Sequence, residues 1–396
     1  MRKKYDSSVI AFAALFLINP IMGILGTALY SWVNKKDFGI KLLMVLIMCY
    51  LSALNTTKVP FDDMIVYLNM FNRVPQNGLL GTLNFWSGSG NFKDPSYSLL
   101  VYVLHYITFG NQYLFIFIVT FLEYWLLFMA IYKFSKEYKL PSYIILTQVF
   151  VLGFFTQYFS LTFHLTRQIL ATSVFFYAIT FRRNSLLKYI VLCVISMTIH
   201  SMTAILVFFS IIPFMQRKLK WKEVILLTLF TAFSITILSN FASFVLETFE
   251  VQGALGGSVT RVVNMEGETD TTSGLNQMLG IVFSILFIIL CFMESQRNEK
   301  MAYPIVINLG LIIAMLILSL SASPLIQNRF FFFLYSILPF LFPLLMRRNV
   351  GLSKIICVTT SIFLVVRFFM TYDHFIKYVP ADEALLYPFF LLIKIA

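Results

Sequence analysis

Long runs of mainly apolar residues recur along this chain. A helix that crosses a bilayer needs roughly 20 such residues, and the longest runs lie at 10–33, 40–54, 113–132, 142–163, 222–245, 277–293, 302–321, 330–346 and 352–370. Inside a bilayer these segments must be helical, because lipid offers no hydrogen-bond partners to peptide groups. With 59% hydrophobic and only 12% charged residues, most of the chain cannot form a water-soluble globule. The sequence therefore predicts an all-α polytopic membrane protein.

Shorter or interrupted apolar segments add to this set, at 97–109, 168–181, 186–213 and 385–395. Long and short segments together predict about eleven to fourteen membrane helices, within a single membrane domain that covers residues 1–396. The basic start of the chain, Met1-Arg2-Lys3-Lys4, resembles that of a signal peptide, but the apolar run continues to Val33 without a clear cleavage site. We therefore expect the first segment to remain as a membrane span.

Charge in the connecting segments indicates which side of the membrane each one faces. Short, strongly basic connections lie at 34–41, 133–139, 182–188, 217–222 and 347–354, and such loops stay on the cytoplasmic side. The long connections are acidic or balanced and should face outward: 55–96, 246–276 and 371–384. This topology puts the amino terminus outside, against the preference of Arg2, Lys3 and Lys4. The net charge of +12 is then a topological signal and not a surface for nucleic acid.

The order of inside and outside connections constrains two of the shorter segments. Residues 97–109 must leave and return on the outer side, which predicts a re-entrant segment. Residues 186–213 must begin and end inside, which predicts a short hairpin with His200 near its outer tip.

Arg167 is a charge set among apolar residues. It follows the uncharged stretch Ser142–Phe163 and precedes fourteen uncharged residues, Gln168–Phe181. A guanidinium in hydrocarbon is costly, so this position indicates an anionic partner. From Arg182 at the inner surface back to Arg167 is about 22 Å of helix, against a hydrocarbon thickness of roughly 30 Å. We expect Arg167 to lie recessed from the outer surface, in a protein cavity.

Two further polar residues fall on the same side by the same arithmetic. Arg329 lies about 27 Å from Arg347, near the outer boundary, and His200 lies about 18 Å from Lys188. We expect all three groups to open to one outward-facing cavity. A pair of arginines suits a phosphate or diphosphate, because the guanidinium fork matches its oxygens and stays charged. The alternative is that each arginine caps carbonyl groups or extends to the membrane interface.

Acid and base candidates lie on the same outer side. Asp94 directly precedes the segment 97–109, so it is either the N-cap of that helix or a general base that takes a proton from an attacking hydroxyl. His200 is either a structural histidine at a turn or an acid, base or phosphate contact, and His164 is a weaker candidate of the same kind. Asp62 and Asp63 have an ordinary explanation as solvated loop charges.

Motifs for metal or covalent chemistry do not occur in the sequence. Its cysteines fall inside apolar segments and without metal-ligand spacing, at Cys49, Cys193, Cys291 and Cys357. They indicate neither a disulfide framework nor a zinc site. There is no HExxH, CxxC, GxSxG or phosphate-loop pattern. We expect no metal and no cofactor.

Taken in order, a series of short motifs resembles the EpsG-like family of Wzy-type polysaccharide polymerases. The motifs are Asp63-x-x-x-Tyr67, Asp94-Pro-Ser-Tyr97-x-Leu-Leu, Arg167-Gln168, His200-Ser201-x-x-Ala204, Asn328-Arg329-Phe330 and Tyr387-Pro388. The similarity extends over about residues 40–390, and the order of the motifs is more specific than any one of them. Two positions depart from the commonest pattern: Asp94 stands where glutamate is frequent, and Ser96 where glycine is.

The resemblance implies a metal-independent, GT-C-like glycosyltransferase of the bacterial cytoplasmic (inner) membrane, with its active site facing outward. Such an enzyme joins oligosaccharide repeat units carried on undecaprenyl diphosphate, for O-antigen, capsule or exopolysaccharide. The implied partners are the lipid-linked donor and acceptor, membrane lipid, a chain-length regulator and a flippase, and no nucleic acid.

The resemblance also implies roles for individual residues. Arg167 and Arg329, with Gln168, would hold the diphosphate of the growing chain and stabilise the charge that develops on it. Asp94, with His200 as its rival, would be the base. Further contacts to substrate are expected from Asp62, Asp63, Tyr67, Tyr97, His164 and Tyr387.

Two other functions stay open at this point. An O-antigen ligase uses the same donor and a similar fold, and the sequence does not separate it cleanly from a polymerase. A transporter or flippase would be expected to show internal repeats and polar groups reachable from both sides. The sequence has no such repeat, and its strong polar sites fall on one side.

Overall fold

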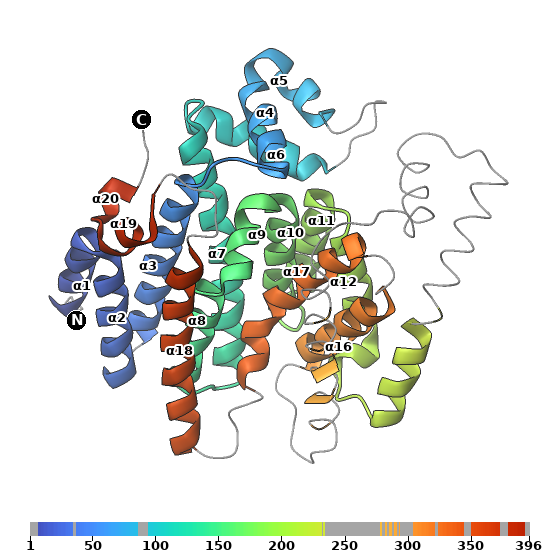
Figure 1. Cartoon of the computed structure of the whole chain (residues 1–396). Helices are drawn as coiled ribbons and strands as arrows, with labels where there is room; N and C mark the ends of the chain where they lie inside the picture. The colour runs from blue at the N-terminus through green and yellow to red at the C-terminus, as the bar shows by residue number, and fades with distance from the viewer. Residues whose placement is uncertain are drawn as a thin grey trace. The chain divides into compact units, whose positions relative to one another are not determined.

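The computed structural model describes residues 7–34, 37–85, 94–231, 304–320, 324–343, 350–372 and 379–392, with isolated positions between 233 and 293. Its regular elements are α1 (Ser7–Ile18), α2 (Pro20–Asn34), α3 (Asp37–Thr56), α4 (Asp63–Asn72), α5 (Val74–Leu83), α6 (Pro95–Ile107), α7 (Gln112–Glu137), α8 (Ser142–Gly153), α9 (Thr156–His164), α10 (Thr166–Ile179), α11 (Leu186–Ile199), α12 (Thr203–Ile211), the 3₁₀ turn η1 (Pro213–Gln216), α16 (Pro304–Ser319), α17 (Pro324–Leu341), α18 (Val350–Tyr372), α19 (Ala381–Leu386) and α20 (Phe389–Leu392). Helices make up the fold throughout the described residues (Figure 1), which confirms the all-α polytopic class.

The chain divides into two compact units. The first unit contains Met1–Phe85, Asp94–Thr203 and Leu338–Ala396, and the second contains Trp86–Lys93 and Ala204–Ile337. Asp63, Tyr67, Asp94, Arg167 and His200 all belong to the first unit.

Among the described residues, three helices are long and apolar enough to cross a membrane: α3, α7 and α18. They correspond to the spans expected at 40–54, 113–132 and 352–370. The span expected at 142–163 is broken, because α8 and α9 meet at an angle of 50°. This break matters for the site, since α9 leads directly into the helix that begins with Thr166 and Arg167.

The apolar run 10–33 folds as two helices and not as one span. Asn19 accepts a hydrogen bond from the backbone N–H of Met22 and so caps α2, which begins at Pro20. The rings of Phe12 and Tyr30 lie 5.5 Å apart, whereas one straight helix would separate them by about 27 Å. The prediction of a continuous span over 10–33 is therefore wrong, because the chain folds back at Asn19 and the two helices pack together.

The remaining apolar segments form shorter helices. The segments at 97–109, 168–181, 302–321 and 330–346 correspond to α6, α10, α16 and α17. The segment 186–213 contains α11 and α12 with His200 between them, and the segment 385–395 is divided by Tyr387 and Pro388, with α19 before them and α20 after them. The segment 222–245 is helical from 221 to 231, and its remainder and most of 277–293 lie outside the described residues. A total of about eleven to fourteen membrane helices stays a prediction.

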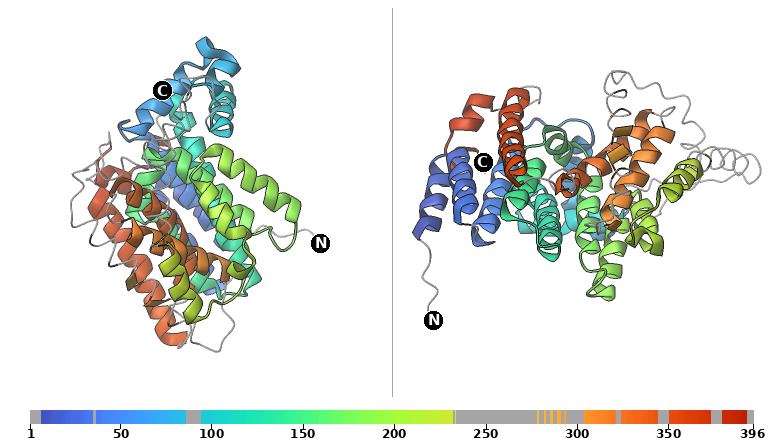
Figure 2. Two further views of the ribbon diagram at one scale, coloured as in Figure 1. Left: turned by 90° about the vertical axis from the view of Figure 1, so that its right-hand side faces the viewer. Right: turned by 90° about the horizontal axis from the view of Figure 1, so that it is seen from below.

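Within the first unit, α7 packs against α3, α8 and α10, and α10 packs in turn against α11. The end of the chain returns to its beginning: the Tyr50 hydroxyl donates to the carbonyl of Ala384 at 2.7 Å, and the Asn19 amide donates to that of Leu385 at 3.3 Å. Figures 1 and 2 show α19 and α20 beside α1 and α2.

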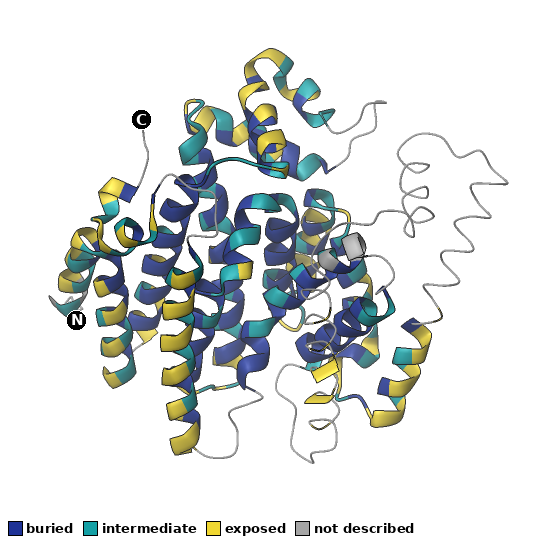
Figure 3. Cartoon of the chain, viewed as in Figure 1, coloured by how far each residue is buried: buried dark blue, intermediate teal, exposed yellow. Residues whose placement is uncertain are grey.

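The three long apolar helices differ in how far they are buried. In their most apolar windows, α3 and α7 are 67% and 61% buried, whereas α18 is only 17% buried (Figure 3). Most of the exposed residues of α18 are large and apolar, among them Ile355, Ile362 and Phe363. A surface of this kind suits contact with lipid, whereas α3 and α7 belong to the core of the first unit.

Candidate functional site

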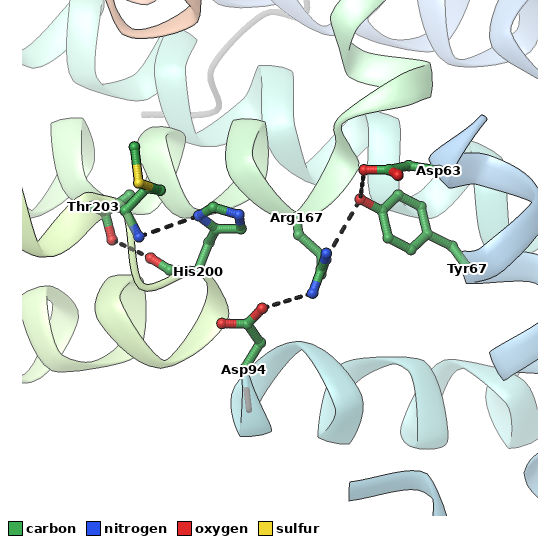
Figure 4. A network of polar contacts seen from close by, with 7 residues as sticks. Asp63, Tyr67, Asp94, Arg167, His200 and Thr203 are labelled. Atoms are coloured by element: carbon green, nitrogen blue, oxygen red, sulfur yellow. Dashed lines mark hydrogen bonds and ion pairs between the residues drawn. The ribbon is translucent and has the colours of Figure 1, made fainter. Parts of the chain in front are cut away.

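Arg167 lies in the first turn of α10, directly after the break that separates this helix from α9. Its Nη1 donates to Oδ2 of Asp94 at 2.6 Å, and the two side chains are only 11% and 3% exposed (Figure 4). Removing two charges from water costs several kcal/mol per ion, and close pairing offsets much of that cost. The anionic partner that the sequence predicted for Arg167 is therefore, in this structure, a residue of the chain itself.

Asp94 occupies the N-cap position of α6, but its side chain makes no capping hydrogen bond. Its backbone is left-handed, with φ 53° and ψ 52°, a conformation that aspartate tolerates better than most residues. The interpretation of Asp94 as a capping residue is thus wrong, because its carboxylate turns to Arg167 instead. Ser96 in the first turn of α6 is hydrogen-bonded to Thr198 of α11, with their hydroxyl oxygens 2.7 Å apart. This bond connects the start of α6, next to Asp94, to α11.

Tyr67 contacts Arg167 from α4. The Nε of Arg167 donates to the Tyr67 hydroxyl at 3.5 Å, and this hydroxyl donates to Oδ2 of Asp63 at 3.2 Å. Burial raises the pKa of Tyr67 above its ordinary value, while the charge of Arg167 acts in the opposite direction. The phenol therefore keeps its proton and can donate to Asp63. We call Asp63, Tyr67, Asp94 and Arg167 the arginine network.

Two further predicted residues are buried, and one of them, Tyr97, contacts this network. Tyr97 is fully buried in α6, its ring stands edge-on to that of Tyr67 at 5.4 Å, and its hydroxyl has no hydrogen-bond partner within the described structure. Gln168 follows Arg167 in α10 and is 3% exposed. The motifs that contain Tyr67, Tyr97 and Arg167 thus come together in space, although they are far apart in the sequence.

His200 lies at the turn after α11, and its ring is held by local contacts. Its Nδ1 accepts from the backbone N–H of Met202 at 3.3 Å, and its carbonyl accepts from the Thr203 hydroxyl at 2.8 Å. In the view of Figure 4, His200 and Tyr67 lie on opposite sides of Arg167. These contacts favour the structural interpretation of His200, with Nδ1 unprotonated, and its role as a base stays a prediction.

The other predicted site residues are dispersed. Asp62 is exposed at the start of α4, Tyr387 is 37% exposed after α19, and the ring of His164 packs on Phe61 at 3.7 Å. Arg329 lies on α17 in the second unit, so its pairing with Arg167 stays a prediction. Within the described residues, no group of three or more His, Cys, Asp or Glu side chains could hold a metal ion.

The pairing of Asp94 with Arg167 is the feature of the site that sequence reasoning missed. The two residues are 73 positions apart, and no periodicity connects them. One signal was present: each residue stands at the opening of a short helix that the topology puts on the outer side. Chemically, the network holds a permanently charged fork next to a carboxylate that a second anion can displace.

The hydroxyl of Tyr67 should matter to any reaction that uses Arg167. Tyr67→Phe keeps the buried ring and removes the contacts to Arg167 and Asp63, so we expect the rate of product formation to fall roughly 10- to 100-fold, the effect of losing hydrogen bonds to charged groups. The matched control is Tyr113→Phe on α7, where the half-buried ring lies outside the network. Equal initial rates for Tyr67→Phe and Tyr113→Phe would contradict a role for this hydroxyl.

The comparisons with known proteins give one match. A profile described as EpsG family matches residues 40–389. Neither the curated proteins nor the solved structures give a significant match to the chain.

Proposed function

Because this chain belongs to the EpsG family, whose profile matches residues 40–389, we propose that it is a polymerase of lipid-linked sugars. It joins oligosaccharide repeat units carried on undecaprenyl diphosphate, at the outer face of the cytoplasmic membrane. The family indicates a glycosyltransferase-like polysaccharide polymerase. The observation that supports a diphosphate-linked glycan donor is the buried ion pair of Arg167 and Asp94.

In the proposed reaction, a sugar hydroxyl of the incoming unit attacks the anomeric carbon of the growing chain. The bond from that carbon to the diphosphate oxygen breaks, and the diphosphate leaves with the electron pair. Negative charge grows on the leaving group, and a fixed cation that meets it there lowers the barrier. Arg167 suits this task because its guanidinium stays protonated and presents a fork of donors to phosphate oxygens.

Asp94 would change partners during the cycle. When the diphosphate enters, its oxygens compete with the Asp94 carboxylate for the donors of Arg167. A carboxylate released from the ion pair is a stronger base, and it can accept the proton of the attacking hydroxyl. One residue thereby serves as the resting counter-ion of Arg167 and as the base of the reaction.

The remaining parts of the proposal rest on membership of the EpsG family. It includes a GT-C-like arrangement of membrane helices, a metal-independent reaction, and Arg329 as a second contact to the diphosphate. A flippase that supplies the lipid-linked units and a regulator of chain length are its expected partners.

The test is reconstitution of the purified protein in liposomes with undecaprenyl-diphosphate-linked repeat units as the only glycan. We expect a ladder of polymer lengths on the lipid, which gel electrophoresis and mass spectrometry can measure. A ligase would transfer glycan to a second acceptor without lengthening the lipid-linked chain, and a transporter would move the units across the bilayer without joining them. Either of these outcomes, without a ladder, would overturn the proposal.

A further inference from the structure

Two buried charges in the first unit take no part in the mechanism above. Lys58 follows the end of α3 and is 1% exposed, and Glu123 lies in the middle of α7 and is 0% exposed. A buried charge is strongly unfavourable unless other groups compensate it, and inside membrane proteins such residues are commonly functional.

Lys58 contacts the short helix α9. Its Nζ donates to the carbonyl of Phe159 at 3.1 Å and lies 3.6 Å from the centre of the Phe159 ring and 5.3 Å from that of Phe163. An ammonium close to aromatic rings is attracted to their π faces. Each of these contacts falls on α9.

Asn55, on the last turn of α3, holds the same helix by a second route. Its Nδ2 donates to the hydroxyl of Thr162 at 2.9 Å and to that of Thr120 at 3.0 Å. The Thr162 hydroxyl donates in turn to the carbonyl of Phe159 at 2.8 Å. The carbonyl of Phe159 thus accepts from both Lys58 and Thr162. We call Asn55, Lys58, Thr162 and this carbonyl the α9 brace.

Glu123 lies on the same helix face as Thr120, whose hydroxyl accepts a hydrogen bond from Asn55 of the brace. It lies three residues after Thr120 on α7, and residues three apart share a face of a helix. Within the described structure its carboxylate oxygens have no hydrogen-bond partner. Burial lowers the pKa of Lys58 well below its ordinary value, and the negative charge of Glu123 opposes that shift.

The position of Arg167 depends on α9. This helix has nine residues, is bent by 50° from α8, and ends at His164, three residues before Arg167. Neither α9 nor α10 has a side-chain hydrogen bond at its N-cap, and helices this short are marginal without tertiary contacts. A shift of α9 therefore carries the start of α10, and the guanidinium with it.

We propose that the α9 brace is a positioning device that sets Arg167 against the diphosphate. This inference rests on the proposed function. In this role the brace residues act on the reaction through the position of Arg167.

The test uses two variants of Thr162, one that removes its hydroxyl and one that keeps it. Thr162→Val keeps the shape of the side chain and cuts the link from Asn55 to the Phe159 carbonyl, whereas Thr162→Ser keeps the hydroxyl. A displacement of about 1 Å at a catalytic group costs roughly 100-fold, so we expect kcat of Thr162→Val to fall about 10- to 100-fold with KM nearly unchanged. We expect Thr162→Ser to stay within about threefold of the wild type.

The matched control is Thr27→Val, because Thr27 is equally buried and its hydroxyl donates only within α2, to the carbonyl of Gly23 at 2.7 Å. We expect its kcat and KM to match those of the wild type. A loss of kcat in Thr27→Val equal to that in Thr162→Val would overturn the inference, since any buried threonine would then have the same effect.

A second variant distinguishes a loss of positioning from a loss of folding. The double change Lys58→Met with Glu123→Gln removes both charges together, so neither is left buried alone, and we expect the melting temperature to stay near that of the wild type while kcat falls. Wild-type kcat in this variant would overturn the inference.

The Arg167→Ala variant distinguishes failure of the brace from failure of the proposed function. If Arg167→Ala keeps full activity, the proposed function fails. If Arg167→Ala is inactive while Thr162→Val is fully active, only the proposal for the brace fails.

Discussion

Replacement of Arg167 with alanine is expected to abolish long polysaccharide chains and leave single repeat units on the lipid carrier. The variant removes the one permanently charged group of the arginine network, which is also the proposed partner of the leaving diphosphate. Loss of such a donor costs about 10²- to 10³-fold in kcat in well-studied enzymes. The measurement is the chain-length distribution in a strain that lacks its own polymerase and expresses the variant. Chains of normal length would contradict both the donor site and the proposed function.

Two companion variants sharpen this result. Arg167→Lys keeps the charge and loses the planar fork, so we expect short chains in low yield, because an ammonium does not reproduce bidentate contacts. Arg183→Ala is the control: Arg183 pairs with Glu137 at 3.0 Å, and the side chains are 58% and 37% exposed. Exposed pairs contribute little, so its chain lengths should be those of the wild type.

The second large effect is expected for Asp94→Asn. This change keeps the shape of the side chain, leaves Arg167 without its counter-charge and removes the proposed base. Breaking a buried pair in this way costs about 3–5 kcal/mol of stability, and loss of a general base costs about 10²- to 10⁴-fold in rate. We expect a lower melting temperature together with polymer below the level of detection in the liposome assay.

Further variants separate the two parts of this effect. In Asp94→Asn combined with Arg167→Ala the charges balance, so stability should recover while activity does not. Asp94→Glu keeps a carboxylate at this position, so substantial activity is expected. Asp37→Asn changes an exposed carboxylate at the start of α3, outside the network, and should have no effect. Full activity in Asp94→Asn would eliminate Asp94 as the base.

The sequence predicted the all-α class of the fold, but it did not predict where apolar segments break into two helices. Hydropathy measures how much apolar length a segment has, and this was enough to identify α3, α7 and α18. It does not report the direction of the chain, so the fold-back between α1 and α2 was missed although Pro20 marked it. The 50° bend between α8 and α9 was missed for the same reason.

The site was predicted in its parts but not in its connections. Arg167 was recognised because a charge in an apolar stretch needs an anion, yet Asp94 as that anion depends on packing between distant segments. Glu123 was overlooked, although it is the only acidic residue in the apolar run 113–132. Lys58 gave no signal, since a lysine just after a span normally lies in solvent and only tertiary contacts bury it.

The return of α19 and α20 to the first helices has a consequence for how the protein is made. Asn19 and Tyr50 are separated by 366 and 334 positions from the carbonyl groups that they contact. At about 5–20 residues per second, the ribosome delivers those carbonyls roughly 20 to 70 s after the first helices have emerged. The amino-terminal helices therefore enter the membrane long before their last partners exist. During that interval the two hydrogen bonds of Asn19 and Tyr50 are absent, so the first helices are incompletely packed.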